Sequence, residues 1–342
     1  MRSRLRRFAA IAAAAAVVTG VVASCGPGGT ASQMLVTNGP GQSASPGASD
    51  GSACSAAPAP PDNQEGWSSA PVAPTVFPVI VNSSGSLTCG LNRLLFTVLD
   101  KDNRPVATPD RTYSIALYDL GRDGGTPTST ADASFVWGIE NERGFYVAAM
   151  TFSEAGRWGA EITTSLGGAA PEKIRMTFDV ATRSPVVRVG DPAPASDTPT
   201  AASVGGDLAR LSTDPKPDPA FYATSVKAAL AAHTPFVLVF ATPKFCASAQ
   251  CGPTLDRVKP IAAAFPTVAF IHVEPYALTF QDGSLQPVLD AQGQLQATQA
   301  VTDWGLLSEP WVFIVDRDGV VTASFEGIVS SAEITAAASA VK

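Results

Sequence analysis

The apolar residues of this chain follow two different patterns, and the change occurs across a segment rich in proline and aspartate, residues 183–215. From 71 to 182 they alternate with polar residues in short runs, which is typical of strands with one buried face. From 216 onwards they form continuous runs such as Pro235–Phe240, which are typical of strands buried on both faces. The chain is long enough for two ordinary domains, so we expect one on each side of a linker at 183–215.

The first pattern predicts an antiparallel β-sandwich over residues 71–182, because short strands separated by turn clusters are the signature of that fold. The segment Phe152–Trp158 resembles a stretch found before the last hairpin of bacterial immunoglobulin-like domains. This resemblance implies an immunoglobulin-like sandwich. The expected strands lie at 79–81, 93–99, 113–118, 145–148, 158–162 and 174–180.

The second pattern predicts an α/β domain over residues 216–342. Gly252 and Pro253 open an expected helix, since proline suits the first helical position, and Ser331 is a suitable N-cap for a closing helix. The turn Asp316–Gly319 predicts a hairpin. The expected order is helix 222–232, strand 235–240, helix 252–265, strand 268–273, hairpin strands 311–315 and 320–325, and helix 331–341.

The positions of two cysteines indicate redox chemistry. Cys246 and Cys251 follow the first buried strand and form the obvious local pair. Five residues of α-helix rise about 7.5 Å, whereas the Cα atoms of a disulfide lie within about 6.8 Å, so a bridge here requires a non-helical segment between the cysteines. At the start of a helix the backbone N–H groups stabilise a thiolate, which can attack a disulfide while a second thiol resolves the intermediate.

Three segments of 216–342 resemble the thioredoxin superfamily. Phe240–Cys246 places a cysteine after a buried strand, Trp304–Val312 is similar to the segment that contains the superfamily's cis-proline, and Phe313–Gly319 is similar to the following hairpin. The resemblance implies a thioredoxin-like fold and a thiol–disulfide oxidoreductase that uses no cofactor or metal. Its partners would be thiols or disulfides of cell-envelope proteins. The implied catalytic residues are Cys246, Cys251 and Pro310, and the carbonyl before Pro310 would face a substrate chain.

The chain departs from the family pattern in the spacing of its cysteines, which are separated by four residues instead of two. Distance from the strand makes Cys246 the nucleophile and Cys251 the resolving residue. The residue types of Cys251–Pro253 favour a second alignment, in which this segment begins the motif and Thr254 replaces the second cysteine. We prefer the first alignment because the distance from the strand determines where the sulfur lies.

The chain also departs from the family in its acidic residues. Many thioredoxins carry a buried acid beneath the active site, but Phe236–Phe240 is entirely apolar. Glu309 is an unusual residue before the expected cis-proline, and it could supply polarity near the sulfurs.

The N-terminal segment predicts export and lipid attachment. Residues 1–24 contain four arginines, an apolar run and small residues before Cys25, as in a secretory signal. The apolar run is shorter than the roughly 20 residues of a membrane-spanning helix. Val22–Cys25 resembles the bacterial lipobox, which implies a diacylglycerol on Cys25 and a protein anchored on the extracytoplasmic face of the cell membrane. The alternative is an ordinary secretory signal followed by a chance cysteine.

The composition after Cys25 predicts a flexible stalk over 25–70, because glycine, serine, proline and alanine bury too little surface to order the chain. Cys54 lies in this stretch, and its pairing with Cys89 would attach the stalk to the sandwich. Without residues 1–24 the chain has 19 basic and 30 acidic residues, a net charge of −11. This charge disfavours nucleic acid and anionic lipid as partners, so membrane attachment would depend on acylation.

Two other functions stay open. A non-catalytic binding or scaffold lipoprotein would keep Cys246–Cys251 as a static bridge, which persists outside the cytoplasm. A copper-handling chaperone would use the two thiolates for Cu(I), although we expect His233 at a helix end and His272 in the core rather than as ligands. The residues indicate neither the redox partner nor the oligomeric state.

Overall fold

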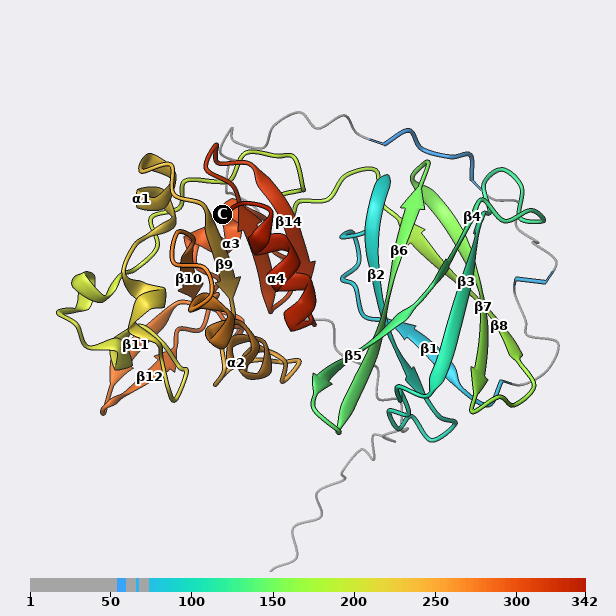
Figure 1. The fold of residues 1–342 in the computed structure, drawn as a ribbon, viewed down its shortest axis with the longest axis horizontal. Helices are drawn as coiled ribbons and strands as arrows, with labels where there is room; N and C mark the ends of the chain where they lie inside the picture. The colour runs from blue at the N-terminus through green and yellow to red at the C-terminus, as the bar shows by residue number, and fades with distance from the viewer. Residues whose placement is uncertain (1–53, 60–65, 68–73) are drawn as a thin grey trace, which may run out of the picture. The chain divides into compact units, whose positions relative to one another are not determined.

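The computed structural model describes residues 54–59, 66–67 and 74–342, and within them β-strands predominate over a few helices (Figure 1). The expected signal segment 1–24, the expected lipidation residue Cys25 and the expected stalk up to residue 53 lie outside the described residues. Within the described part, none of the helices combines the length and apolar character needed to cross a membrane.

The N-terminal half is a β-sandwich of two antiparallel four-stranded sheets, as the alternating pattern predicts. One sheet has the order β1-β2-β6-β5 and the other the order β4-β3-β7-β8. Alternate residues such as Ile115, Leu117 and Trp158 are buried in one core, which explains the period of two. The strands are β1 (Phe77–Ile80), β2 (Gly90–Leu99), β3 (Arg111–Asp119), β4 (Ser129–Asp132), β5 (Ser134–Ile139), β6 (Arg143–Phe152), β7 (Gly156–Leu166) and β8 (Glu172–Val180).

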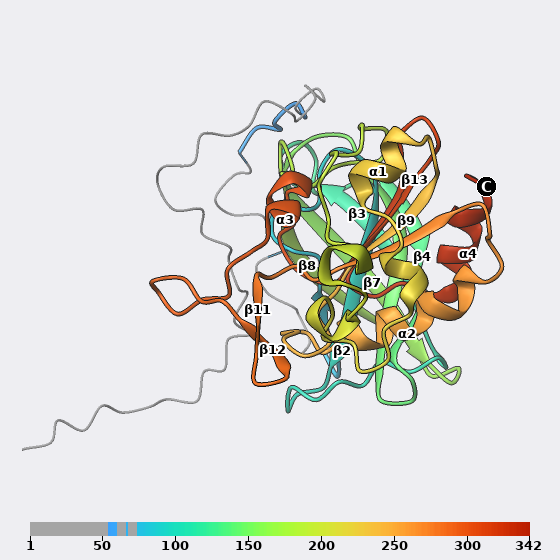
Figure 2. The same cartoon turned by 90° about the vertical axis from the view of Figure 1, so that its left-hand side faces the viewer.

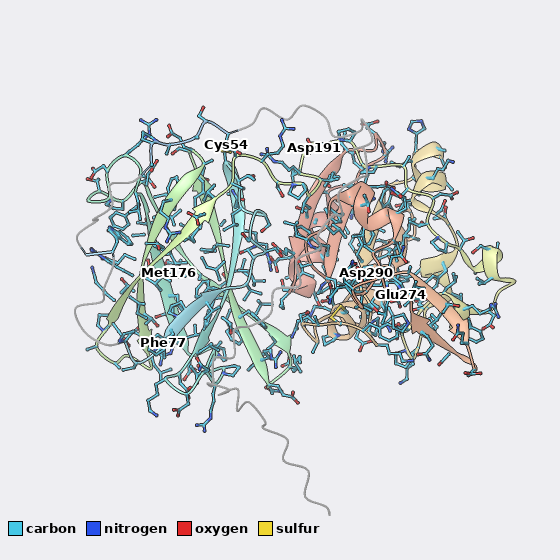
Figure 3. The ribbon with its side chains drawn as sticks, turned by 180° about the vertical axis from the view of Figure 1, so that it is seen from behind. Cys54, Phe77, Met176, Asp191, Glu274 and Asp290 are labelled. Carbon is cyan, nitrogen blue, oxygen red and sulfur yellow. A yellow bond between two sulfur atoms is a disulfide. The ribbon has the colours of Figure 1, made fainter. Side chains whose placement is uncertain are left out.

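Two described parts of the expected stalk are attached to the sandwich. Cys54 forms a disulfide with Cys89 across a Cα–Cα distance of 5.6 Å, which confirms that pairing (Figure 3). The ring of Trp67 packs edge-on against Tyr118 at 4.9 Å, and its indole N–H donates to a backbone carbonyl. The prediction of a flexible stalk through residue 70 is therefore wrong for 54–59 and 66–67, because a covalent bond and an aromatic contact hold them.

The C-terminal half contains a four-stranded sheet of order β10-β9-β13-β14 with helices on both faces. Strands β9 (Phe236–Phe240) and β10 (Ala269–Val273) are parallel, whereas β13 (Trp311–Val315) and β14 (Val321–Glu326) are antiparallel neighbours. Figure 2 shows α3 and α4 on opposite sides of β9. The remaining elements are η3 (Pro219–Tyr222), α1 (Val226–Ala231), α2 (Cys251–Ala262), β11 (Leu278–Gln281), β12 (Ser284–Pro287), α3 (Gln299–Trp304) and α4 (Ser331–Ser339).

The segment predicted as a linker, 183–215, belongs largely to the C-terminal half. Val186 is buried in the core that contains α1 and α3, and Gly190 and Asp191 exchange backbone hydrogen bonds with Val321 of β14. Two short 3-10 helices, η1 (Ala201–Val204) and η2 (Leu208–Arg210), follow. The predicted linker boundary at 215 is therefore wrong, because this segment pairs with and packs on the sheet.

An ion pair joins β2 of the sandwich to α4. Arg93 Nε donates to Glu333 Oε1 at 2.7 Å, and Glu333 also forms a capping box with Ser330 at the start of the helix. Burial raises the pKa of Glu333, but the hydrogen bonds and charge of Arg93 and the bonds from Ser330 lower it further, so its pKa lies below the usual value.

This shift makes a prediction about stability. Because folding lowers the pKa of Glu333, its charged form contributes stability above the unfolded pKa of about 4.3 and loses it as pH falls through the folded pKa. E333Q keeps the capping geometry but removes the charge. We expect it to lower the free energy of unfolding by about 2 kcal/mol at pH 7 and by much less near pH 2.5, measured by urea titration. E142Q, at an exposed position, is the control; an equal loss for E333Q at both pH values would contradict the prediction.

Candidate functional site

The loop after β9 carries the first cysteine of the candidate site. All five residues of β9 are completely buried, as the continuous apolar run predicts. Ala241 and Thr242 continue this burial, and the chain then emerges so that Cys246 is partly exposed. The strand therefore delivers Cys246 to the edge of the sheet without burying its sulfur in the core.

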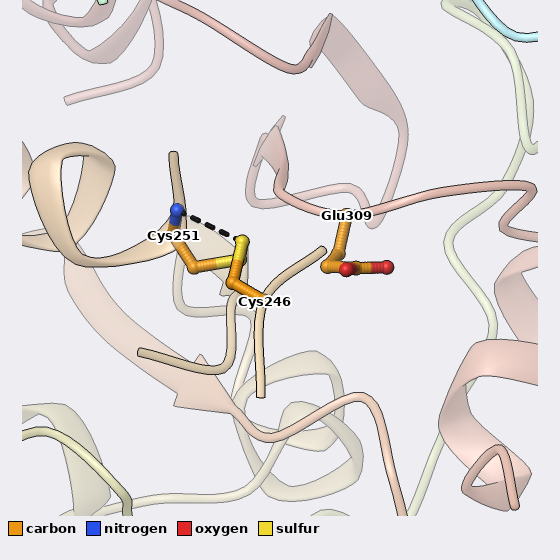
Figure 4. Close-up of side chains that lie close together, drawn as sticks. All are labelled: Cys246, Cys251 and Glu309. Atoms are coloured by element: carbon orange, nitrogen blue, oxygen red, sulfur yellow. Dashed lines mark hydrogen bonds between the residues drawn. A yellow bond between two sulfur atoms is a disulfide. The ribbon is translucent and has the colours of Figure 1, made fainter. Parts of the chain in front are cut away.

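Cys246 and Cys251 form a disulfide with a Cα–Cα distance of 6.0 Å, as predicted (Figure 4). Cys251 is the first residue of α2 and is fully buried, and its N–H donates to Cys246 Sγ at 3.2 Å. The helix thus starts two residues earlier than Pro253, while the segment between the cysteines stays non-helical. Cys246, the residue expected to be the nucleophile, is therefore the more accessible of the two cysteines.

The loop that contains Pro310 lies opposite the bridge. The Glu309–Pro310 peptide bond is cis, and Pro310 is buried. The N–H of Ala247 donates to Glu309 Oε1 at 3.1 Å, and the hydroxyl of Ser248 donates to the Glu309 carbonyl at 3.3 Å. The structure therefore brings the three predicted site residues, Cys246, Cys251 and Pro310, to one edge of the sheet.

Glu309 is the acidic group of this site, and Tyr276 holds it. The Tyr276 hydroxyl donates to Glu309 Oε2 at 2.7 Å. Burial raises the pKa of Glu309 by more than the bonds from Tyr276 and the Ala247 N–H lower it. Burial, followed by the charge of Glu309, raises the pKa of Tyr276 as well. The partly buried Glu309 and the buried Tyr276 therefore form a hydrogen-bonded pair beside the disulfide.

The donor set does not fit a metal ion in this oxidised state. Within the described residues, Cys246, Cys251 and Glu309 form a group whose sulfur and carboxylate atoms lie within 4.8 Å of one another. The two sulfurs are bonded to each other, so neither is a thiolate ligand. His272 is buried with Nδ1 2.7 Å from the Tyr222 hydroxyl and Nε2 2.8 Å from a backbone carbonyl, which leaves neither nitrogen free for a metal.

Tyr276 also lines a small cavity of about 140 Å³ beside β10. Tyr222, His272 and Glu274 (labelled in Figure 3) contribute polar groups to its wall. Burial lowers the pKa of His272, which favours the neutral ring. Sequence reasoning did not identify Tyr276. The one available signal was the placement of Glu274 directly after a buried strand, at the edge where the cysteine loop also lies.

Comparisons with known proteins assign no family to this chain. No protein-family model matches it, and no curated protein matches it. Among solved structures, a DUF4426 family protein from Pseudomonas aeruginosa PAO1 is 14% identical with a TM-score of 0.23, covering 32% of this chain and 91% of that one. MtrC from Shewanella baltica OS185 is 14% identical with a TM-score of 0.22, covering 44% of this chain and 28% of that one.

The unequal exposure of the two sulfurs predicts unequal reactivity after reduction. In the single variants C251S and C246S, iodoacetamide should modify the remaining Cys246 at least about ten times faster than the remaining Cys251, because only Cys246 is partly exposed. Peptide mass spectrometry after timed alkylation measures both rates. Equal rates in folded protein would contradict the expected division of roles.

Proposed function

We propose that this chain is a membrane-anchored, extracytoplasmic thiol–disulfide oxidoreductase with a thioredoxin-like domain behind an immunoglobulin-like sandwich. The observation that carries the proposal is the Cys246–Cys251 bridge at the first turn of α2, with one sulfur partly exposed and the other buried, opposite Pro310. A partly exposed Cys246 can react with a partner protein as the nucleophile, whereas the buried Cys251 can resolve the mixed disulfide without contacting the partner.

The topology of the C-terminal half supports the proposed thioredoxin-like fold. A parallel pair, β9 and β10, is followed by an antiparallel hairpin, β13 and β14, in one sheet. Helices α2 and α4 contribute to the core on one face, and α1 and α3 to the core on the other. This arrangement is the one that the sequence resemblance implies. The two four-stranded sheets of the N-terminal half likewise support an immunoglobulin-like sandwich.

The proposed reaction needs no cofactor. The reduced Cys246 thiolate attacks one sulfur of a partner disulfide, forming a mixed disulfide and releasing one partner thiolate. The Cys251 thiolate then attacks Cys246 Sγ, closing the bridge and releasing the second partner thiolate. At the N-terminus of α2, the Cys251 N–H donates to Cys246 Sγ and stabilises the thiolate form of Cys246. The reverse sequence oxidises a partner dithiol.

Trapping of the intermediate tests this proposal. C251A should accumulate mixed disulfides with envelope proteins, because no second thiol resolves them, and the matched double variant C246A/C251A should accumulate none at this site. The wild-type bridge should have a reduction potential above about −300 mV, the upper limit typical of structural disulfides. A lower potential together with no trapped partner would instead support a static bridge in a scaffold protein.

The proposed membrane anchor has a separate test. In a bacterial host, C25S should abolish incorporation of radiolabelled palmitate, because the acylated thiol is removed, and should release the protein from the membrane fraction. C54S is the matched control, since Cys54 pairs with Cys89 and should leave labelling unchanged. Label that survives C25S would contradict the lipoprotein assignment.

A further inference from the structure

The central strand β9, which leads to the bridge, offers no acid to handle protons. Phe236–Phe240 is apolar and has no exposed surface, so β9 cannot host an ionisable side chain without a large desolvation penalty. Yet the buried Cys251 leaves as a thiolate whenever the bridge is opened at Cys246. A thiolate in an apolar environment is itself unfavourable, so a proton donor near Cys251 would assist this step.

Glu309 has the position that such a donor requires. Its carboxylate and both sulfurs lie within 4.8 Å of one another, a separation that a single bridging water can span. It lies on the loop before β13, across from the start of the helix that carries Cys251 (Figure 4). Proton transfer through this carboxyl therefore needs no rearrangement of the sheet.

The hydrogen bonds of Glu309 hold its carboxyl in a defined orientation. Tyr276 donates to Oε2 and the Ala247 N–H donates to Oε1, so each oxygen has one donor. The charged groups on neighbouring elements are engaged elsewhere. Lys244 donates to the carbonyl of Leu285, and Glu326 accepts from Ser83 and Ser308. Among the described residues, Tyr276 is the titratable side chain that donates to Glu309, and the sulfurs of the two cysteines lie within 4.8 Å of its carboxylate.

We propose that Glu309, positioned by Tyr276, is the proton-transfer residue of the Cys246–Cys251 couple. When a partner thiolate attacks Cys246 Sγ, the S–S bond breaks and its electron pair goes to Cys251; the neutral Glu309 carboxyl gives its proton to that thiolate. In the opposite direction the Glu309 carboxylate takes the proton from the Cys251 thiol, which then attacks Cys246 in the mixed disulfide. Water returns a proton to Glu309 after the first step and takes the proton from it after the second.

This inference rests on the proposed function for its partner dithiol, but its chemistry is testable with glutathione alone. Burial raises the pKa of Glu309 above its usual value, which favours the neutral carboxyl that donates a proton when the bridge opens. The rate at which Cys251 resolves a Cys246–glutathione mixed disulfide should therefore rise with pH as Glu309 loses its proton. We call this rising part of the pH–rate profile the limb of Glu309. The Tyr276 hydrogen bond lowers this pKa, so its loss should move the limb to higher pH.

The experiment compares wild type, E309Q, Y276F and the control E326Q by rapid mixing of reduced protein with oxidised glutathione between about pH 4 and pH 9. E309Q should slow resolution about 100-fold and remove the limb, Y276F should keep the limb at higher pH, and E326Q should match wild type. Circular dichroism checks that each variant is folded.

The outcomes separate this inference from the proposed function. If E309Q resolves the mixed disulfide at the wild-type rate with the same pH limb, the role of Glu309 is overturned whatever the physiological partner. If the rising part of the pH profile of Y276F stays at the same pH as in wild type, the positioning role of Tyr276 is overturned. If wild type and variants behave as expected with glutathione but C251A traps no envelope protein, the proposed function fails and the proton-transfer role stands.

Discussion

The complete burial of β9 determines where every part of the candidate site lies. Its five side chains fill the cores on both faces of the sheet, and each contributes about 1.5–3 kcal/mol of hydrophobic stabilisation. Phe240, its last residue, pairs with Val273 of β10 on one side and with Trp311 of β13 on the other. The loops that carry Cys246, Tyr276 and Pro310 therefore meet at one edge, because the register of a single strand brings them there.

This dependence explains which parts of the site could be predicted from sequence. Continuous apolar runs located β9, β10 and β13, and the distance from β9 located Cys246. Tyr276 was missed because the stretch between β10 and α3 has no hydrophobic period, and the short hairpin of β11 and β12 within it is only partly buried. In the sandwich, β4 was missed for a related reason: its sequence, STAD, is polar, and it is held by backbone pairing with β3 at the edge of the sheet.

Average composition is a poor guide to whether a connecting segment is ordered, because a few individual residues can anchor the whole segment. The composition around Cys54 and Trp67 predicts disorder, yet a disulfide, backbone hydrogen bonds of residues 54–57 and the contacts of Trp67 attach the described residues to the sandwich. The segment 183–215 reads as a linker, yet burial of Val186 and backbone bonds to Val321 make it part of the C-terminal sheet domain. A low apolar content predicts little hydrophobic stabilisation, but it gives no information about covalent or backbone anchors.

The burial of β9, which positions Cys246, also restricts where an acidic side chain can lie near the disulfide. A carboxylate within β9 would lie at a position with no exposed surface, where burying its charge carries a large desolvation penalty. At the loop before β13, Glu309 is only partly buried and has the Tyr276 hydroxyl and the Ala247 N–H as donors. A sheet that excludes polar groups from its central strand can thus still place an acid beside the disulfide, provided that the acid comes from a neighbouring loop at the end of that strand.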